Sequence, residues 1–193
     1  MKMGARYLVR VENSRKLPIT DYSRVRQSYG RMLADFGCRL NSSRISSVAV
    51  ELDFFAPDRR KAEEMVELLR SQVRVLSTSD LLANEAVEGK EKTLEEAKRL
   101  FNEERFWEVH EKVEGIWRTA SGEEKQVQQS IILYAGALVH YQKNEMETTL
   151  RMLKRSLEKM KWSADSYFCF DLSRMRREAE GMIGRGSVSV FRL

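Results

Sequence analysis

The sequence has few of the residues that break helices or crosslink chains. Its 193 residues include two prolines and two cysteines, and Cys38 and Cys169 do not form the C-x-x-C spacing of a zinc or redox site. No apolar run approaches the roughly 18 residues that a membrane span needs, and no signal peptide precedes the first strand-like segment. A glycine-rich phosphate loop and a nucleophile elbow are also missing. These absences predict a cytoplasmic, helix-rich protein with reduced thiols, no membrane association and no cofactor.

The charges are unevenly distributed along the chain. Residues 1–80 carry 15 basic and 10 acidic side chains, residues 81–150 carry 9 and 14, and residues 151–193 carry 10 and 5. Solvated protein faces account for most such patterns, so the excess of basic residues does not by itself indicate a ligand. It leaves nucleic-acid binding through the N-terminal region as one alternative.

An N-terminal α/β domain is predicted for residues 1–80. Strand-like segments at 6–12, 45–55 and 73–78 alternate with amphipathic helices, one running from Asp21 to about Leu40 and one that begins at Asp58. This order predicts a ferredoxin-like α/β sandwich with three strands. The C-terminal segment, residues 183–193, alternates apolar and polar residues after a glycine, so it is either a fourth strand of this sheet or a tail.

A helical domain is predicted for residues 93–182, after a charged linker at residues 81–92. Thr93 and Glu96 have the spacing of a capping box, which predicts that a helix begins at Thr93 and continues to Asn102. Further helices are expected at about 105–119, 123–143, 145–161 and 166–182, from their apolar periodicity. The fold class of the whole chain is therefore α+β, an α/β sandwich followed by a bundle of helical hairpins.

One block of the helical domain resembles the domain-of-unknown-function family 309, whose members are small helical proteins. This block reads F-N-x-x-x-F-W-E-V-H-E-x-x-E-x-x-W and runs from Phe101 to Trp117. The resemblance covers about residues 94–160, although Lys143 stands where the family has a glycine. The family has no established activity to transfer to this chain. Its second block is matched by Gln129, Ala135, His140 and Asn144.

Helical spacing separates the side chains of this block into three groups. An apolar stripe faces the core, Glu108 and Lys112 lie on the opposite, solvated side, and Trp107 and Glu111 lie at the flank. His110 and Glu114 lie at the inner edge of the stripe, where polar groups need partners. The stripe consists of Phe106, Val109, Val113 and Trp117.

We call the predicted helix that carries this block the motif helix. A short connection near Ser121 predicts an antiparallel hairpin between the motif helix and the next helix. Positions at equal distance from the turn should then meet, which places Glu114 near Gln129, Trp107 near Gly136, and Asn102 near His140. His110 and His140 are offset by roughly 12 Å along the helices, too far apart to hold one ion. A buried network of His110, Glu114 and Gln129 is the predicted structural role of these residues.

Three functions are compatible with the sequence, two of them at this surface and one in the N-terminal domain. The leading prediction is a non-catalytic binding or scaffold protein, whose cleft at the motif helix receives a protein, a peptide or a small ligand. A metal-assisted hydrolase with His110 as ligand or acid and Glu111 or Glu114 as general base is less favoured. The second histidine of H-E-x-x-H is missing, so Glu114 would have to replace a nitrogen ligand beside His110. Nucleic-acid binding is the third, and homo-oligomers are compatible with each. The candidate residues are Asn102, Trp107, His110, Glu111, Glu114, Gln129 and His140.

Overall fold

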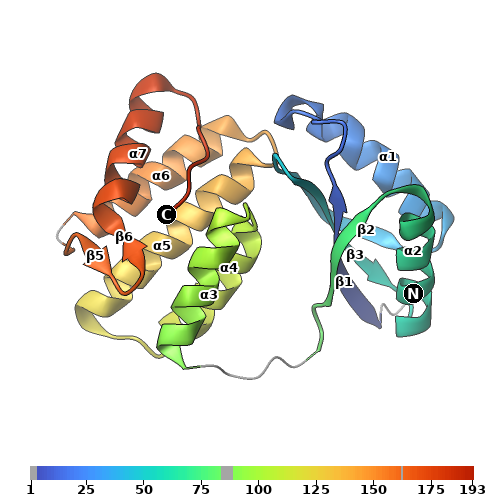
Figure 1. The fold of residues 1–193 in the computed structure, drawn as a ribbon, viewed down its shortest axis with the longest axis horizontal. Helices are drawn as coiled ribbons and strands as arrows, with labels where there is room; N and C mark the ends of the chain where they lie inside the picture. The colour runs from blue at the N-terminus through green and yellow to red at the C-terminus, as the bar shows by residue number, and fades with distance from the viewer. Residues whose placement is uncertain (1–3, 84–88, 162) are drawn as a thin grey trace. The chain divides into compact units, whose positions relative to one another are not determined.

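The computed structural model describes residues 4–83, 89–161 and 163–193 (Figure 1). These residues divide into two compact units, the first containing residues 4–83 and 142–144 and the second containing residues 89–141 and 145–193. Within the described part of the chain, no helix combines the length and the apolar character needed to cross a bilayer.

The first unit alternates strands and helices. Its sheet has the order β2-β3-β1-β4, and each neighbouring pair is antiparallel. This order and the succession β-α-β-β-α-β are those of a ferredoxin-like fold. The sequence predicts that class but only three of the four strands. The elements are β1 (Ala5–Glu12), a 3-10 turn (Ile19–Asp21), α1 (Tyr22–Asp35), β2 (Arg39–Ile45), β3 (Ala49–Ala56), α2 (Arg59–Gln72) and β4 (Val75–Asp80).

Two helices cover one face of this sheet because alternate strand residues are apolar. Val9 and Leu52 are buried in one cluster with Leu33 of α1 and Met65 of α2. Side chains at successive strand positions point to opposite faces, so the residues between them lie on the other face of the sheet. As predicted, Asp58 caps α2, where its carboxylate accepts a hydrogen bond of 2.8 Å from the backbone N–H of Lys61.

The fourth strand is β2, in place of the C-terminal segment that the sequence suggested. The predicted helix to Leu40 instead ends at Asp35, and Gly37 follows with a φ of +78°, a conformation that glycine adopts without strain. The polar run after Leu40 looks like a turn but lies inside the strand. Its Asn41 side chain donates a hydrogen bond of 2.7 Å to Asp53 of β3, so these polar residues belong to a polar sheet face.

The second unit is a row of helical hairpins. The central helix is α5, which packs between α4 and α6 (Figure 1). Its buried residues, including Ile131 and Leu138, belong to one core with residues of α3, α4, α6 and α7. The elements are α3 (Lys90–Asn102), α4 (Phe106–Trp117), α5 (Gly122–Tyr141), α6 (Met146–Met160), the short strands β5 (Ser166–Tyr167) and β6 (Phe170–Asp171), and α7 (Leu172–Arg185).

Two helix starts differ from the prediction. Helix α3 begins at Lys90, so Thr93 lies inside it, where its hydroxyl donates to the backbone carbonyl of Gly89 at 3.1 Å. The prediction of a capping box at Thr93 and Glu96 is therefore wrong. Residues 166–171 form a hairpin instead of a helix, and α7 begins after Asp171, whose side chain accepts a hydrogen bond of 2.8 Å from the backbone of Arg174.

The C-terminal segment is not a strand. Helix α7 ends at Gly186 with a φ of +65°, and the backbone N–H of Ser187 donates to the carbonyl of Met182, which is the usual left-handed end of a helix. The residues that follow return across the second unit, and Val188, Phe191 and Leu193 pack against the helical core. The apolar alternation of this segment therefore reflects packing on helices.

Candidate functional site

The motif helix α4 has the predicted apolar stripe. Phe106, Val109 and Val113 are fully buried, while Trp117 is half-buried and the Lys125 ammonium group lies 4.7 Å from the centre of its ring. The prediction that Glu108 is solvated is wrong. Only 16% of its side chain is exposed, because it forms two hydrogen bonds, of 2.6 and 2.5 Å, with the guanidinium of Arg105.

His110, Glu111 and Glu114 form a cluster on the outer side of α4. The Nδ1 atom of His110 lies 3.3 Å from Oε1 of Glu111 and 3.8 Å from Oε2 of Glu114. One potential ligand atom from each residue lies within 4.8 Å of the other two. The side chains are 30%, 50% and 31% exposed, respectively, and Arg118 also contacts Glu114, at 3.2 Å. The two predicted inward residues are thus near each other at a solvent-accessible edge.

Gly136 of α5 lies beneath His110. A methyl group built on Gly136 would be 3.7 Å from Cδ2 of His110 and 2.7 Å from Cε of Met152 in α6. The absence of a side chain therefore lets Met152 and the imidazole approach the α5 backbone. The sequence predicted that a side chain packs closely on this glycine, but it named Trp107 in place of His110 and Met152. Trp107 is half-buried and packs against the same core.

Gln129 does not complete a network with His110 and Glu114, since its side chain forms no hydrogen bond with any described residue. The neighbouring residue Gln128 is the fully buried amide instead. Its Nε2 atom donates to the hydroxyl of Tyr167 at 2.8 Å, and that hydroxyl donates to Glu124 at 2.8 Å. The network therefore links α5 to the β5-β6 hairpin.

Burial raises the pKa of Tyr167 to about 12, and the nearby Glu124 carboxylate acts in the same direction. The hydrogen bond from Lys90 is the main cause of the lowered pKa of Glu124. Sequence reasoning missed this network because Tyr167 is far from α5 in the chain and belongs to a hairpin that was predicted to be helical.

Asn102 contacts the C-terminal segment, whereas the sequence predicted that it would lie near His140. Its carboxamide oxygen accepts a hydrogen bond of 2.7 Å from the backbone N–H of Leu193, and its Nδ2 donates to the Leu193 carbonyl at 3.3 Å. His140 instead pairs with Glu145, beyond the end of α5. One asparagine side chain therefore binds both backbone groups of a single residue.

Phe191 is the aromatic anchor of the same segment. Its ring centre lies 5.5 Å from that of Phe101 and 6.2 Å from that of Tyr134, both in edge-to-face arrangements. The guanidinium carbon of Arg174 lies 5.4 Å from the centre of the Phe191 ring. We call the surface formed by Phe101, Asn102, Tyr134 and Arg174 the tail groove, and Phe191 and Leu193 occupy it.

The tail is held mainly by side chains. Residues 188–192 make no backbone hydrogen bond to any other described residue, and Ser189 receives only a side-chain contact of 3.3 Å from Arg185. A segment with few backbone hydrogen bonds belongs to the least stable part of a structure. Side-chain contacts and the Asn102 hydrogen bonds to Leu193 are therefore the main attachments of the tail.

Four hollows in the described part of the chain are lined by residues other than His110, Glu111 and Glu114. Three border α1 in the first unit, with volumes of about 650, 780 and 540 Å³. The fourth, of about 390 Å³, lies over charged side chains of α3 and Lys112. The predicted cleft at the motif helix is not one of these hollows.

The polar face of the first unit's sheet carries basic residues that are paired with carboxylates. Arg6 forms hydrogen bonds of 3.0 and 2.8 Å with Asp53, and Arg44 forms one of 2.6 Å with Glu51. Arg10 lies 3.5 Å from the same Glu51. Pairing reduces the positive potential available to phosphate groups. Nucleic-acid binding through this unit stays a prediction.

Comparison with known proteins identifies the second unit. Residues 94–152 match a family described as a domain of unknown function, DUF309. Through these residues, the chain belongs to this family. The resemblance of the F-W-E-V-H-E block is thus confirmed, and the DUF309 region contains α3, α4 and α5 and ends within α6.

One solved structure is similar to part of the chain. The chain is 30% identical to a conserved hypothetical protein from Thermus thermophilus, over 47% of this chain and 95% of that one, with a TM-score of 0.43. No curated protein matches the chain. The chain therefore combines an N-terminal α/β unit with a DUF309 region at residues 94–152.

Proposed function

We propose that the DUF309 unit is a binding module for an extended polypeptide segment, and that the C-terminal tail is its ligand within the same chain. The observation that carries the proposal is the pair of hydrogen bonds between Asn102 and the backbone of Leu193. An amide that binds both the N–H and the C=O of one residue recognises extended backbone whatever side chain that residue has. Such main-chain contacts are a general source of affinity in peptide recognition.

The aromatic pocket supplies the selectivity of the proposed site. Phe191 lies two positions before the residue that Asn102 binds, and it meets two aromatic rings and one guanidinium group. Aromatic anchors in well-packed pockets carry much of the binding energy of protein interfaces. The preferred ligand is therefore an extended segment with an aromatic residue, any residue, and then an apolar residue.

The proposed groove uses a different part of the motif from the cleft that the sequence suggested. Phe101 and Asn102, at the start of the motif, contribute to the tail groove. His110, Glu111 and Glu114 cluster with one another on α4 and are not among the residues that form the tail groove. Substitutions in the two groups should consequently have separable effects.

Binding in trans tests the proposal. A fluorescein-labelled peptide with the sequence of residues 186–193 is titrated into a chain truncated after Gly186, and its anisotropy is recorded. We expect saturable binding that weakens by about tenfold in Asn102→Asp, since that variant keeps one acceptor but loses the amide donor. The intact chain should bind the peptide more weakly than the truncated chain because its own tail competes.

Two controls make the result specific. A peptide with alanine in place of Phe191 should bind at least about tenfold more weakly, given the value of aromatic contacts. His110→Ala in the truncated chain should leave the affinity unchanged. Binding that is lost in His110→Ala but kept in Asn102→Asp would place the ligand at the motif helix and contradict the proposal.

Divalent-cation binding at the His110 cluster is a second candidate, supported by the approach of three potential ligand atoms to within 4.8 Å of one another. An imidazole and two carboxylates are a common donor set for zinc and related ions, which need ligand distances of about 2.0–2.2 Å. If Glu111 and Glu114 are both ligands, neither is free to act as the general base that a hydrolase needs. This geometry therefore supports metal binding more than hydrolysis.

Calorimetric titration with Zn²⁺ and Mn²⁺ tests the second candidate. We expect one site per chain that disappears in Glu114→Gln, while Glu108→Gln, on the same helix but paired with Arg105, retains it. Unchanged binding in Glu114→Gln, or heats no larger than dilution in the native chain, would rule this site out.

A further inference from the structure

A crevice between α1 and α2 in the first unit combines an apolar interior with a basic entrance. Its volume is about 540 Å³, within the range of small-molecule sites. The apolar walls come from both helices and the sheet, through Val25, Met32, Val50 and Leu69. Val25, Val50 and Leu69 are core residues of this unit, so the crevice reaches its hydrophobic core.

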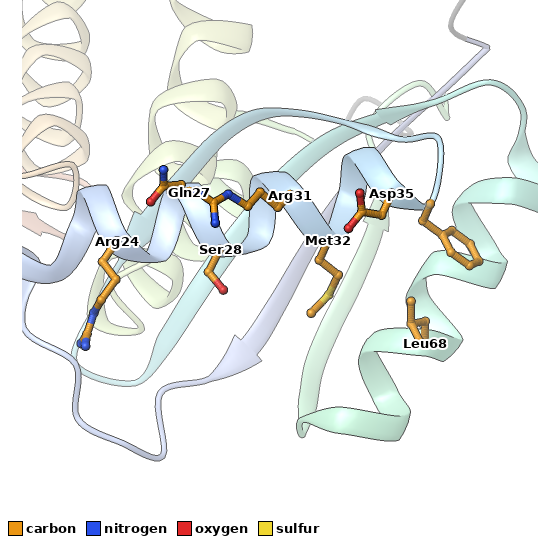
Figure 2. A pocket seen from close by; sticks show the side chains of 8 residues that line it. Arg24, Gln27, Ser28, Arg31, Met32, Asp35 and Leu68 are labelled. Atoms are coloured by element: carbon orange, nitrogen blue, oxygen red, sulfur yellow. The ribbon is translucent and has the colours of Figure 1, made fainter.

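A second hollow, of about 650 Å³, adjoins this crevice (Figure 2). Arg24, Ser28 and Met32 line both, and they follow one another at four-residue intervals on one side of α1. Figure 2 shows these three side chains projecting from the same side of α1, with Leu68 of α2 near the Met32 end of the row. The two hollows therefore form one continuous depression along α1.

The entrance of this depression is positively charged. Arg31 lines the outer hollow, and its guanidinium group forms no hydrogen bond or ion pair with any described residue, while Arg24 is bound to Asp21 at 2.7 Å. Arg15 is at the other side of the crevice. By contrast, the exposed Arg59 and Arg60 of α2 are each paired with a glutamate one helical turn away.

Two carboxylates also line the depression, but neither forms an ion pair with Arg31. Glu12 is paired with Arg74 at 3.1 Å. Asp35 lies one turn beyond Arg31 on α1 and makes no ion pair with it. A guanidinium group without a protein partner is well suited to bind a carboxylate or phosphate through paired hydrogen bonds.

We infer that this crevice binds a small amphipathic anion, a single aliphatic chain with a carboxylate or phosphate head. The chain enters between α1 and α2 and contacts Met32, Val25 and Leu69. The head remains at the entrance, where Arg24 and Arg31 donate hydrogen bonds to it. Burial of the chain and charge-assisted contacts to the head supply different parts of the affinity. The site lies in the first unit and is independent of the tail groove.

Calorimetric titration of the full chain with decanoate and with decyl phosphate tests the inference. We expect saturable one-to-one binding of at least one of them, and the tighter ligand identifies the head group. Acetate and inorganic phosphate lack the chain, and decanol lacks the charge, so each should bind at least about tenfold more weakly. Decanol binding as tightly as both anions would overturn the assignment of the arginines.

Variants locate the site. Ser28→Phe places a ring in the depression from an exposed position of α1 and should abolish binding, while the circular dichroism spectrum confirms that the variant is folded. Replacing Arg24 and Arg31 by glutamine should weaken binding by about tenfold or more. Arg26→Gln is the matched control, because Arg26 is on the same helix but lines a different hollow. Native affinity in both the Ser28 and the double arginine variants, or no saturable binding of either anion to the native chain, would refute the inference.

Discussion

Removal of the Phe191 ring should release the tail without unfolding the helices. Full burial of a phenylalanine side chain contributes about 1.5–3 kcal/mol, and each edge-to-face ring contact adds about 0.5–1.5 kcal/mol. Phe191 is only half-buried and makes two such contacts. We therefore expect Phe191→Ala to destabilise the docked tail by about 2 kcal/mol, which corresponds to about a 30-fold increase in the equilibrium constant for tail opening.

The backbone amide of Leu193 reports this opening. It is protected by the Asn102 carboxamide at 2.7 Å, so its hydrogen exchange, followed by NMR, requires the tail to leave the groove. Exchange at Leu193 should accelerate by about 30-fold in Phe191→Ala. Val190→Ala is the control, because Val190 is 36% exposed. Equal exchange rates in the native chain and Phe191→Ala, or an equal acceleration in Val190→Ala, would refute the reasoning.

Further predictions concern the stability of the second unit. Tyr167→Phe leaves the buried Gln128 amide without its partner and should lower the free energy of unfolding by about 1–3 kcal/mol in urea denaturation. Burial raises the pKa of Tyr167 to about 12 in the folded state, whereas the pKa in the unfolded chain is about 10. The contribution of Tyr167 to the free energy of unfolding is therefore complete below about pH 10 and declines as the pH rises from there to about 12. The stability of Tyr167→Phe should lack this part of the alkaline decline. Asp171→Ala removes the cap of α7 and should cost about 1 kcal/mol by the same assay, whereas Asp171→Asn should cost much less.

The apolar periodicity of the sequence was sufficient to predict most elements of both units. The α+β class, the ferredoxin-like first unit and the helical second unit follow from spacing such as that of Val9 and Val11 in a strand or Phe106, Val109 and Val113 in a helix. These patterns are reliable because one face of each element is buried and the other is not.

The missed strand shows where periodicity was not sufficient. Strand β2 contains Asn41-Ser42-Ser43, residue types that are typical of turns. They occur in a strand here because this face of the sheet is polar, and Asn41 binds Asp53 of the neighbouring strand. Pairing with the next strand, β3, stabilises these residues in β2, and residue preferences alone do not reveal that pairing.

The candidate site was predicted in part. The His110 and Glu114 side chains approach each other as their four-residue spacing requires. The role of Asn102 was not predictable from spacing, because its partner Leu193 lies 91 positions later in the chain. Gln129 and Gln128 were interchanged for a similar reason, since the partner of Gln128 is Tyr167 in a later hairpin.

The most direct test of the tail groove follows the amide resonances of a chain truncated after Gly186 while a peptide of residues 186–193 is added. We predict that truncation shifts the resonances of Asn102 and Tyr134 and that saturating peptide returns them to their positions in the full chain. Resonances of His110 and Glu114 should change little. Shifts confined to the His110 cluster, or no return of the Asn102 resonance, would contradict a groove that binds extended segments.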